Sequence, residues 1–171
     1  MTDSAFQAAF DEHKDAVYRF AWRMAGPDFA EDIAQDVFLT LLRQPGRFDP
    51  ARGTMRAFLL GVARNLALKR WRDDHRWDPL DDEAFEAPPV DITSGETAQI
   101  VGAAVQALPP LQREALILAE YEELSLDEIA RAVDAEVGTV KSRLHRARQN
   151  LKRMLTPLRP SSLVRSSHGS V

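Results

Sequence analysis

Cysteine is absent from all 171 residues, which excludes disulfide bonds and metal sites built from thiolates. The four histidines lie far apart and lack the spacing of metal ligands, so we expect neither a metal nor a cofactor. No apolar run approaches the roughly 18 residues that a membrane span requires, and the acidic N-terminal segment has no signal-peptide core. The composition therefore predicts a cytoplasmic protein without membrane insertion.

Signals for β-strands are also scarce. Alternating β-branched runs do not occur, whereas apolar residues recur at the i, i+3 and i+4 spacing of amphipathic helices. The dipeptides Gly26-Pro27 and Pro45-Gly46 divide the first part of the chain into helices, and Asp28 and Thr54 are placed to cap the second and third. Three helices around one apolar core are expected within residues 1–76.

A change of composition predicts the domain organisation. Residues 77–97 combine proline, glycine, serine and acidic residues without a sustained period, which is typical of a linker. Helical spacing resumes over residues 98–156, where Ser125 and Glu128 form a capping box, and residues 157–171 are expected to be a flexible tail. The predicted fold class is all-α, with two small helical domains, an acidic linker and a C-terminal helix-turn-helix.

The charge of the chain is segregated along its length. The formal net charge is −4, yet the segment VGTVKSRLHRARQNLKRML at residues 137–155 contains six basic residues and no acidic one. The amphipathic segment SLDEIARAV at 125–133 precedes it. A short helix, a tight turn and a basic second helix are the parts of a helix-turn-helix, and DNA phosphate is the usual partner of such a helix. A C-terminal amphipathic helix with a solvated basic face is the alternative.

A helical wheel divides this basic segment into two faces. Val140, Leu144 and Ala147 share the apolar face, and small or bidentate polar groups occupy the opposite one. Arg146 has the geometry to pair with guanine and Gln149 with adenine. For His145, a phosphate contact or simple exposure is as compatible with the spacing as base recognition. Phosphate contacts are expected from the flanking basic residues Lys141, Arg148 and Lys152.

The first domain carries a second basic block at residues 43–77, and acidic stretches separate it from the basic segment at 137–155. Two such blocks predict two separate contacts with a polyanion, although each alone is compatible with a solvated helix face.

Two sets of motifs resemble the bacterial sigma factors of the extracytoplasmic-function type. The sequence LPPLQREALILAEYEELSLDEIARAVDAEVGTVKSRLHRARQNLKRML is similar to region 4 of that family, and VGTVKSRLHRAR is its most specific part. The segment AEDIAQDVFLTLLR resembles region 2.2, and FDPARGTMRAFLLGVARNLALKRWR resembles regions 2.3 and 2.4. The resemblance implies a non-enzymatic transcription initiation factor that binds core RNA polymerase and recognises promoters.

The resemblance also implies roles for particular residues. Recognition of the −35 element as duplex is expected from Lys141, Ser142, Arg143, His145, Arg146 and Gln149. Melting of the −10 element and its capture as a single strand require a positive track and a surface that holds an unstacked base. The resemblance assigns these roles to Phe48, Arg56, Arg64, Asn65, Lys69 and Arg72, and for Phe48 a core-plugging role is the alternative. Binding to the polymerase β′ clamp coiled coil is expected from Glu31, Asp32, Gln35 and Asp36. The β flap, promoter DNA and an anti-sigma factor are the other implied partners.

Three other functions were compared with this one. A stand-alone helix-turn-helix regulator would need neither an acidic polymerase-binding face nor a base pocket. An enzyme is disfavoured because the sequence has no nucleophile–base pair, phosphate-binding glycine loop or metal cluster. A pure protein-interaction module is disfavoured by the basic helix. The acidity of the chain further predicts that the free protein binds DNA weakly, held off by its own charge or by a partner that clamps its two domains together.

Overall fold

The computed structural model describes residues 1–74, 82, 85–88, 90–91 and 95–156. Within these residues the secondary structure is entirely helical, which confirms the all-α prediction. The predicted C-terminal tail and most of the predicted linker lie outside the described residues. The helices are α1 (Asp3–Ala25), α2 (Pro27–Arg43), the 3-10 helix η1 (Pro45–Arg47), α3 (Met55–Asp73), α4 (Thr97–Ala107), α5 (Pro110–Leu116), the π-helical turn η3 (Ile117–Tyr121), α6 (Leu126–Ala132) and α7 (Val137–Leu155).

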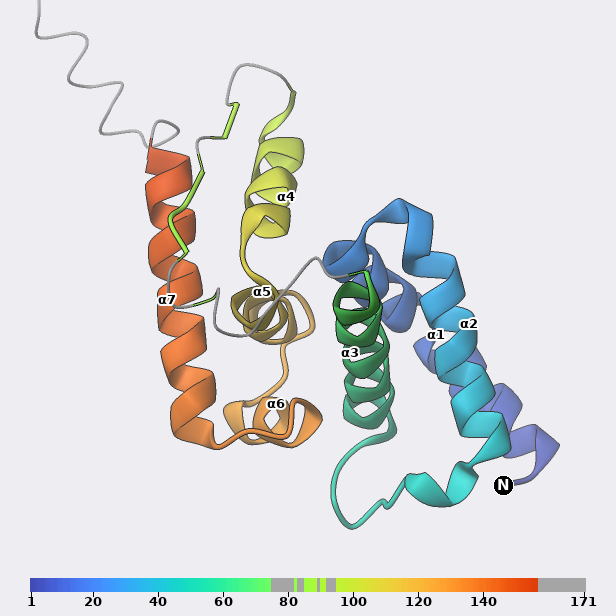
Figure 1. Cartoon of the computed structure of the whole chain (residues 1–171). Coiled ribbons are helices and arrows are strands. Elements are labelled where there is room, and N and C mark those ends of the chain that lie inside the picture. Colours follow the sequence, from blue (N-terminus) through green and yellow to red (C-terminus); the bar gives the residue numbers. More distant parts are fainter. Residues whose placement is uncertain (75–81, 83–84, 89, 92–94, 157–171) are drawn as a thin grey trace, which may run out of the picture.

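Helices α1, α2 and α3 form the N-terminal half, on the right in Figure 1. Gly26 separates the first two helices with a positive φ of 87°, a conformation that glycine adopts without strain. Pro27 is the first residue of α2, so the predicted cap at Asp28 is wrong. Thr54 does cap α3, because its hydroxyl accepts a hydrogen bond from the Ala57 amide at 3.1 Å.

The core of this half consists of large apolar side chains from all three helices. Fully buried members include Phe20, Met24, Ile33, Leu41, Leu59 and Leu60. Helical spacing predicts that Leu42 also faces inward, but 53% of it is exposed. Leu41 takes the inward position, and the next residue is rotated by about 100° on the helix. An apolar residue is therefore left on the surface of α2.

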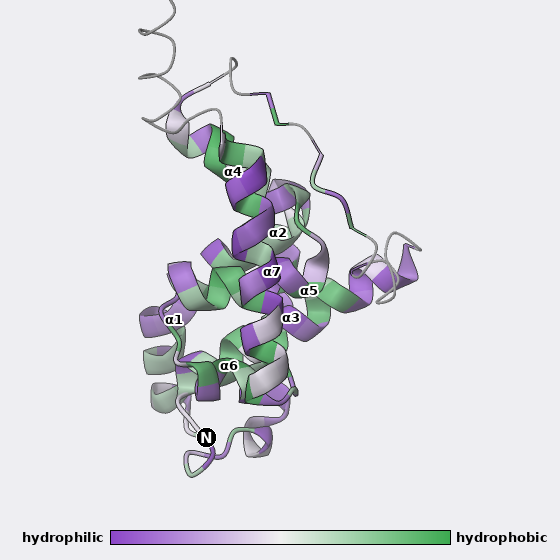
Figure 2. Ribbon diagram, turned by 90° about the vertical axis from the view of Figure 1, so that its left-hand side faces the viewer, coloured by the Kyte–Doolittle hydropathy of each residue, from purple (hydrophilic) through white to green (hydrophobic). Residues whose placement is uncertain are grey.

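Helices α4 to α7 form the C-terminal half. Ser125 and Glu128 make the predicted capping box, with reciprocal bonds of 3.2 Å and 3.0 Å. Asp134 has a positive φ of 50° in the turn between α6 and α7, and α6 packs on α7 as a helix-turn-helix requires. In Figure 2, hydrophilic and hydrophobic residues alternate along the helices, as expected for helices that each bury one face.

The two halves pack against each other. Helix α3 lies beside α6, and α1 contacts α4, α5 and η3 (Figure 1). Between α3 and α6, a Cβ built on Gly61 would lie 3.1 Å from the Ala132 carbonyl oxygen and 3.6 Å from the Ala132 Cβ. Arg113 strengthens the contact, since its Nη1 donates to the Met24 carbonyl at 2.6 Å and its guanidinium lies 4.8 Å from the Trp71 ring centroid. Burial lowers the pKa of Arg113 to about 10, so the group remains charged at neutral pH.

A polar pair inside the C-terminal half provides a stability test. Asn150 of α7 is buried, and its Nδ2 donates to the Gln112 Oε1 of α5 at 2.8 Å. Replacement Asn150→Ala should lower the free energy of unfolding by about 1–3 kcal/mol, because buried Gln112 loses its partner. Urea denaturation measures the effect, and Gln149→Ala on the exposed face is the matched control. Equal stability of the two variants would contradict the assignment.

Candidate DNA and polymerase interfaces

The outward face of α7 carries most of the residues predicted to read the −35 element. Lys141, Ser142, His145, Arg146 and Gln149 are all exposed. They follow the first turn of the helix, and their donors and acceptors face away from the apolar side formed by Val140, Leu144 and Ala147. The second helix of a helix-turn-helix presents such groups to base edges in the major groove.

Two basic residues of α7 lie apart from this face. Arg143 is half-buried, and its Nη1 lies 3.8 Å from the Glu114 Oε1 on α5. Arg148 donates from Nε to the Glu120 Oε1 at 3.1 Å. In this arrangement Arg143 therefore belongs to an internal ion pair, whereas Arg146 and Gln149 remain free of any carboxylate contact given for the described residues.

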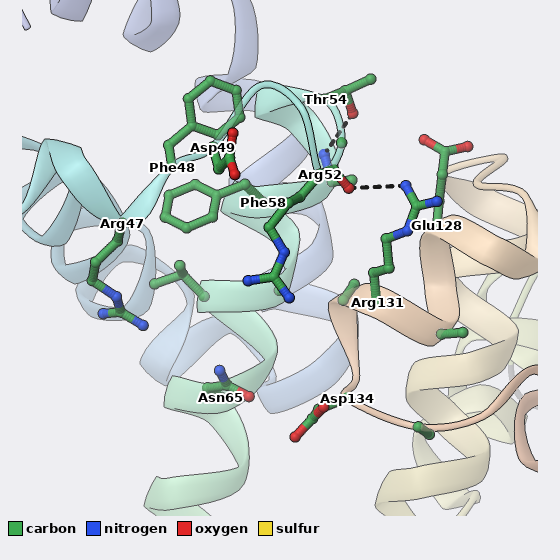
Figure 3. A pocket seen from close by; sticks show the side chains of 17 residues that line it. Arg47, Phe48, Asp49, Arg52, Thr54, Phe58, Asn65, Glu128, Arg131 and Asp134 are labelled. Atoms are coloured by element: carbon green, nitrogen blue, oxygen red, sulfur yellow. Dashed lines mark hydrogen bonds between the residues drawn. The ribbon is translucent and has the colours of Figure 1, made fainter.

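A cleft of about 450 Å³ surrounds Phe48 and Asn65. Figure 3 shows its two walls, one from α3 and the preceding loop, and the other from α6 and the turn after it. Phe48 stacks at a tilt on Phe58, with 5.6 Å between ring centroids, so an aromatic surface lines the cleft. Arg131 crosses from α6 and donates to the Arg52 carbonyl at 2.8 Å (Figure 3). The Phe48 ring and the Asn65 amide, which the sequence predicts to act together, line the same cleft, but α6 covers one side of it.

Two arginines predicted to contact the −10 strand are engaged by carboxylates of the C-terminal half. Arg64 binds Glu114 with both ends of its guanidinium, from Nε at 2.6 Å and from Nη2 at 3.0 Å. Arg56 Nη2 lies 2.6 Å from the Glu122 Oε2. Burial raises the pKa of Glu114, an effect that the hydrogen bond and charge of Arg64 and the charge of Arg143 oppose.

The other two basic residues of the predicted −10 set, Lys69 and Arg72, are exposed near the end of α3. They are not part of the Phe48–Asn65 cleft. The six predicted residues thus fall into three groups along α3 and its preceding loop: a pair in the cleft, a pair bound to carboxylates and a pair open to solvent.

The predicted polymerase face is the exposed side of α2. Its members Glu31, Asp32, Gln35 and Asp36 are all exposed, and Asp32 Oδ2 lies 3.8 Å from Arg70 Nη2. An apolar groove continues from Gln35 between α1 and α2, and is lined by Phe6, Gln7, Phe10, Gln35, Phe38, Leu39 and Leu42. Leu39 and Leu42 were not predicted to lie on the surface, but both are exposed, because the apolar residues of α2 span more of the helix than one buried face can cover.

In the part of the chain that the structure describes, no cluster of histidine, aspartate and glutamate has the arrangement of a metal site. No helix among those residues is long and apolar enough to cross a membrane.

Comparison with known proteins places both halves of the chain. Residues 9–77 match the model of Sigma-70 region 2, and residues 98–151 match that of Sigma-70, region 4. The ECF RNA polymerase sigma factor SigE of Mycolicibacterium smegmatis is 33% identical over 163 residues, which cover 88% of this chain and 63% of SigE. SigK of Mycobacterium sp. strain KMS is 32% identical, covering 88% of this chain and 83% of SigK. SigW of Bacillus subtilis is 31% identical, with 90% of each chain covered.

A solved structure has the same arrangement of helices. The sigma factor RpoE of Bartonella quintana, in complex with the anti-sigma factor NepR, superposes with a TM-score of 0.71. It is 27% identical, and the match covers 91% of this chain and 99% of RpoE. CnrH, in complex with the cytosolic domain of CnrY, has the same fold with a TM-score of 0.66. The chain therefore belongs to the ECF RNA polymerase sigma factors, the transcription initiation factors that direct RNA polymerase to promoters.

Proposed function

We propose that this protein joins core RNA polymerase and recognises its promoters at two separate places. The N-terminal domain, residues 1–76, captures and melts the −10 element, and the C-terminal domain, residues 98–156, reads the −35 duplex. Residues 77–97 connect the two domains. The observation that supports this proposal most directly is that the exposed polar groups of α7 belong to the C-terminal half, whereas Phe48 and Asn65 belong to the N-terminal half.

For the −35 element, α7 inserts into the major groove. Arg146 pairs with guanine and Gln149 with adenine, while Lys141 and Ser142 lie where the helix enters the groove. For the −10 element, a flipped base stacks on Phe48 and contacts Asn65, and Lys69 and Arg72 hold the backbone of the same strand. These contacts require no catalytic group, so the protein acts as a non-enzymatic factor.

Polymerase binding uses the exposed side of α2. Its carboxylates suit the cationic surface of the β′ clamp coiled coil, and the neighbouring apolar groove supplies area that can be removed from water. The C-terminal domain contacts the β flap. Each DNA-binding domain alone is small, but attachment to one polymerase makes the second DNA contact intramolecular and so raises the overall affinity.

An anti-sigma factor is the proposed regulatory partner, in a cytoplasmic setting. The support is the likeness to RpoE, whose structure was solved with the anti-sigma factor NepR. A stand-alone regulator is the alternative function, and membership of the sigma-factor family disfavours it. Run-off transcription with purified core polymerase on a genomic promoter library distinguishes the two, because a regulator that needs another sigma factor would produce no transcript.

Arg146 provides a residue-level test of −35 recognition. Arg146→Ala should reduce transcription from a −35-dependent promoter by about 5- to 160-fold, as expected for one lost bidentate base contact of about 1–3 kcal/mol. Binding to core polymerase should be unchanged, since Arg146 lies on the outward face of α7. Arg153→Ala on the same helix is the matched control near its C-terminal end. Unchanged promoter selectivity in Arg146→Ala would contradict the base-reading role.

A further inference from the structure

Glu122 is a buried carboxylate whose charged neighbours all come from the other half of the molecule. It is 0% exposed at the end of η3. Arg56 Nη2 lies 2.6 Å from its Oε2, Arg19 Nη2 lies 3.8 Å from the same oxygen, and Arg23 Nη1 lies 3.9 Å from Oε1. Arg19 and Arg23 belong to α1 and Arg56 to α3, so these residues form one Glu122 cluster across the contact between the halves.

The cluster holds more positive charge than one carboxylate neutralises. Three guanidinium groups face a single anion, and the Glu122 Oε1 has no hydrogen-bond partner among the described residues. The arginine side chains retain access to solvent, with 50%, 28% and 36% exposed for Arg19, Arg23 and Arg56. Burial of a carboxylate with an unsatisfied oxygen costs desolvation free energy, which weakens the net stability of its pairing with these arginines. Another anion can therefore compete with Glu122 for them.

The guanidinium groups indicate which kind of anion competes. Arg56 belongs to α3, the helix that also carries the cleft residues Ala57 and Asn65, but Arg56 itself does not line the cleft. Guanidinium forks bind phosphate oxygens with the same geometry as carboxylate oxygens.

We propose that Arg19, Arg23 and Arg56 form a binding site for a DNA backbone phosphate, and that Glu122 occupies this site in the closed arrangement. The proposal rests on the proposed function in one respect, because the phosphate is taken to belong to promoter DNA. Separation of the two halves removes Glu122 and also uncovers the cleft that α6 borders. Glu122 is thus a competitor for DNA within the same chain.

The first experiment compares two neutralising substitutions in the full-length chain. Glu122→Gln removes the competing charge, whereas Glu123→Gln removes the same charge from the adjacent, exposed residue. Affinity for a fluorescein-labelled single-stranded DNA of random sequence is measured by anisotropy. Glu122→Gln should bind about tenfold more tightly than Glu123→Gln, because the binding-competent population rises. Equal affinities would overturn the competition by Glu122.

The second experiment opens the contact without altering a charge. Ala132→Leu enlarges a side chain that already lies against Gly61, and it should also raise the affinity for the labelled strand. In this background, Arg19→Ala with Arg23→Ala should reduce the slope of log affinity against log salt by about 0.7, the value for one phosphate contact on a single strand. An unchanged slope would overturn the phosphate site and leave the cluster as a structural ion pair only.

The proposed function is tested separately by run-off transcription of the wild-type protein with core polymerase. If transcription fails while the salt slope changes as expected, the phosphate site stands and the promoter function is rejected. If transcription succeeds and the slope does not change, the function stands and the site is rejected.

Discussion

Oxidation of a Gly61→Cys, Ala132→Cys double variant should reduce promoter-dependent transcription by about tenfold or more, since only the minor uncrosslinked population can open. The built Cβ of residue 61 lies 3.6 Å from the Ala132 Cβ, within the range of disulfide-bonded cysteines. A disulfide there holds α6 against α3. The Phe48–Asn65 cleft is then covered on one side, and Glu122 remains beside its arginines.

The absence of natural cysteine makes this experiment clean, because the only possible intramolecular disulfide is the engineered one. Non-reducing electrophoresis measures the crosslinked fraction, and addition of dithiothreitol should restore transcription to the same sample. Each single cysteine variant, oxidised in the same way, is a matched control. Full transcription by the crosslinked protein would show that the closed arrangement does not restrict promoter binding.

Reversal of charge on α2 should have the second large effect. Asp32→Arg with Asp36→Arg replaces two exposed carboxylates by cations on the proposed polymerase face, and apparent affinity for core polymerase should fall by more than about tenfold. Competition with another sigma factor for a limiting amount of core measures the change. Asp11→Arg with Asp15→Arg is the control, because it makes the same charge change at the same spacing on α1.

The thermal midpoint of both double variants should be close to that of the wild type, because exposed charges contribute little to stability. Asp32 lies 3.8 Å from Arg70, an exposed pair of this kind. Normal competition for core by the Asp32, Asp36 variant would reject the acidic face and direct attention to the apolar groove at Leu39 and Leu42. A loss of competition equal to that of the control variant would also reject it.

Local signals accounted for most of the fold. Helical periodicity, the cap at Thr54 and the capping box of Ser125 with Glu128 all act within four residues, so they can be read directly from the sequence. The basic face of α7 follows from helical geometry in the same way. The prediction failed at Asp28 and Leu42, where Pro27 begins the helix and neighbouring Leu41 takes the buried position.

The candidate sites could be predicted only in part. Phe48 and Asn65 were grouped by the family resemblance, and the structure places them in one cleft. The buried partners Gln112 and Asn150 were missed, because a polar residue on a helix shows no sign in the sequence of its partner on another helix. The exposed position of Leu39 and Leu42 likewise depends on how much of α2 the neighbouring helices cover.

The sequence by itself determined the helices, the caps of α3 and α6, the two basic segments and the family, since each of these depends on residue type at short spacing. Only the tertiary structure decided which basic side chains are paired with carboxylates and which are open to a DNA phosphate. Arg56 and Arg64 are cationic whether or not the two halves are packed together. Their ion pairs with Glu122 and Glu114 span 66 and 50 residues of the chain, so the carboxylates reach them only when the halves pack against each other. Contact across that distance depends on packing, which residue spacing cannot specify.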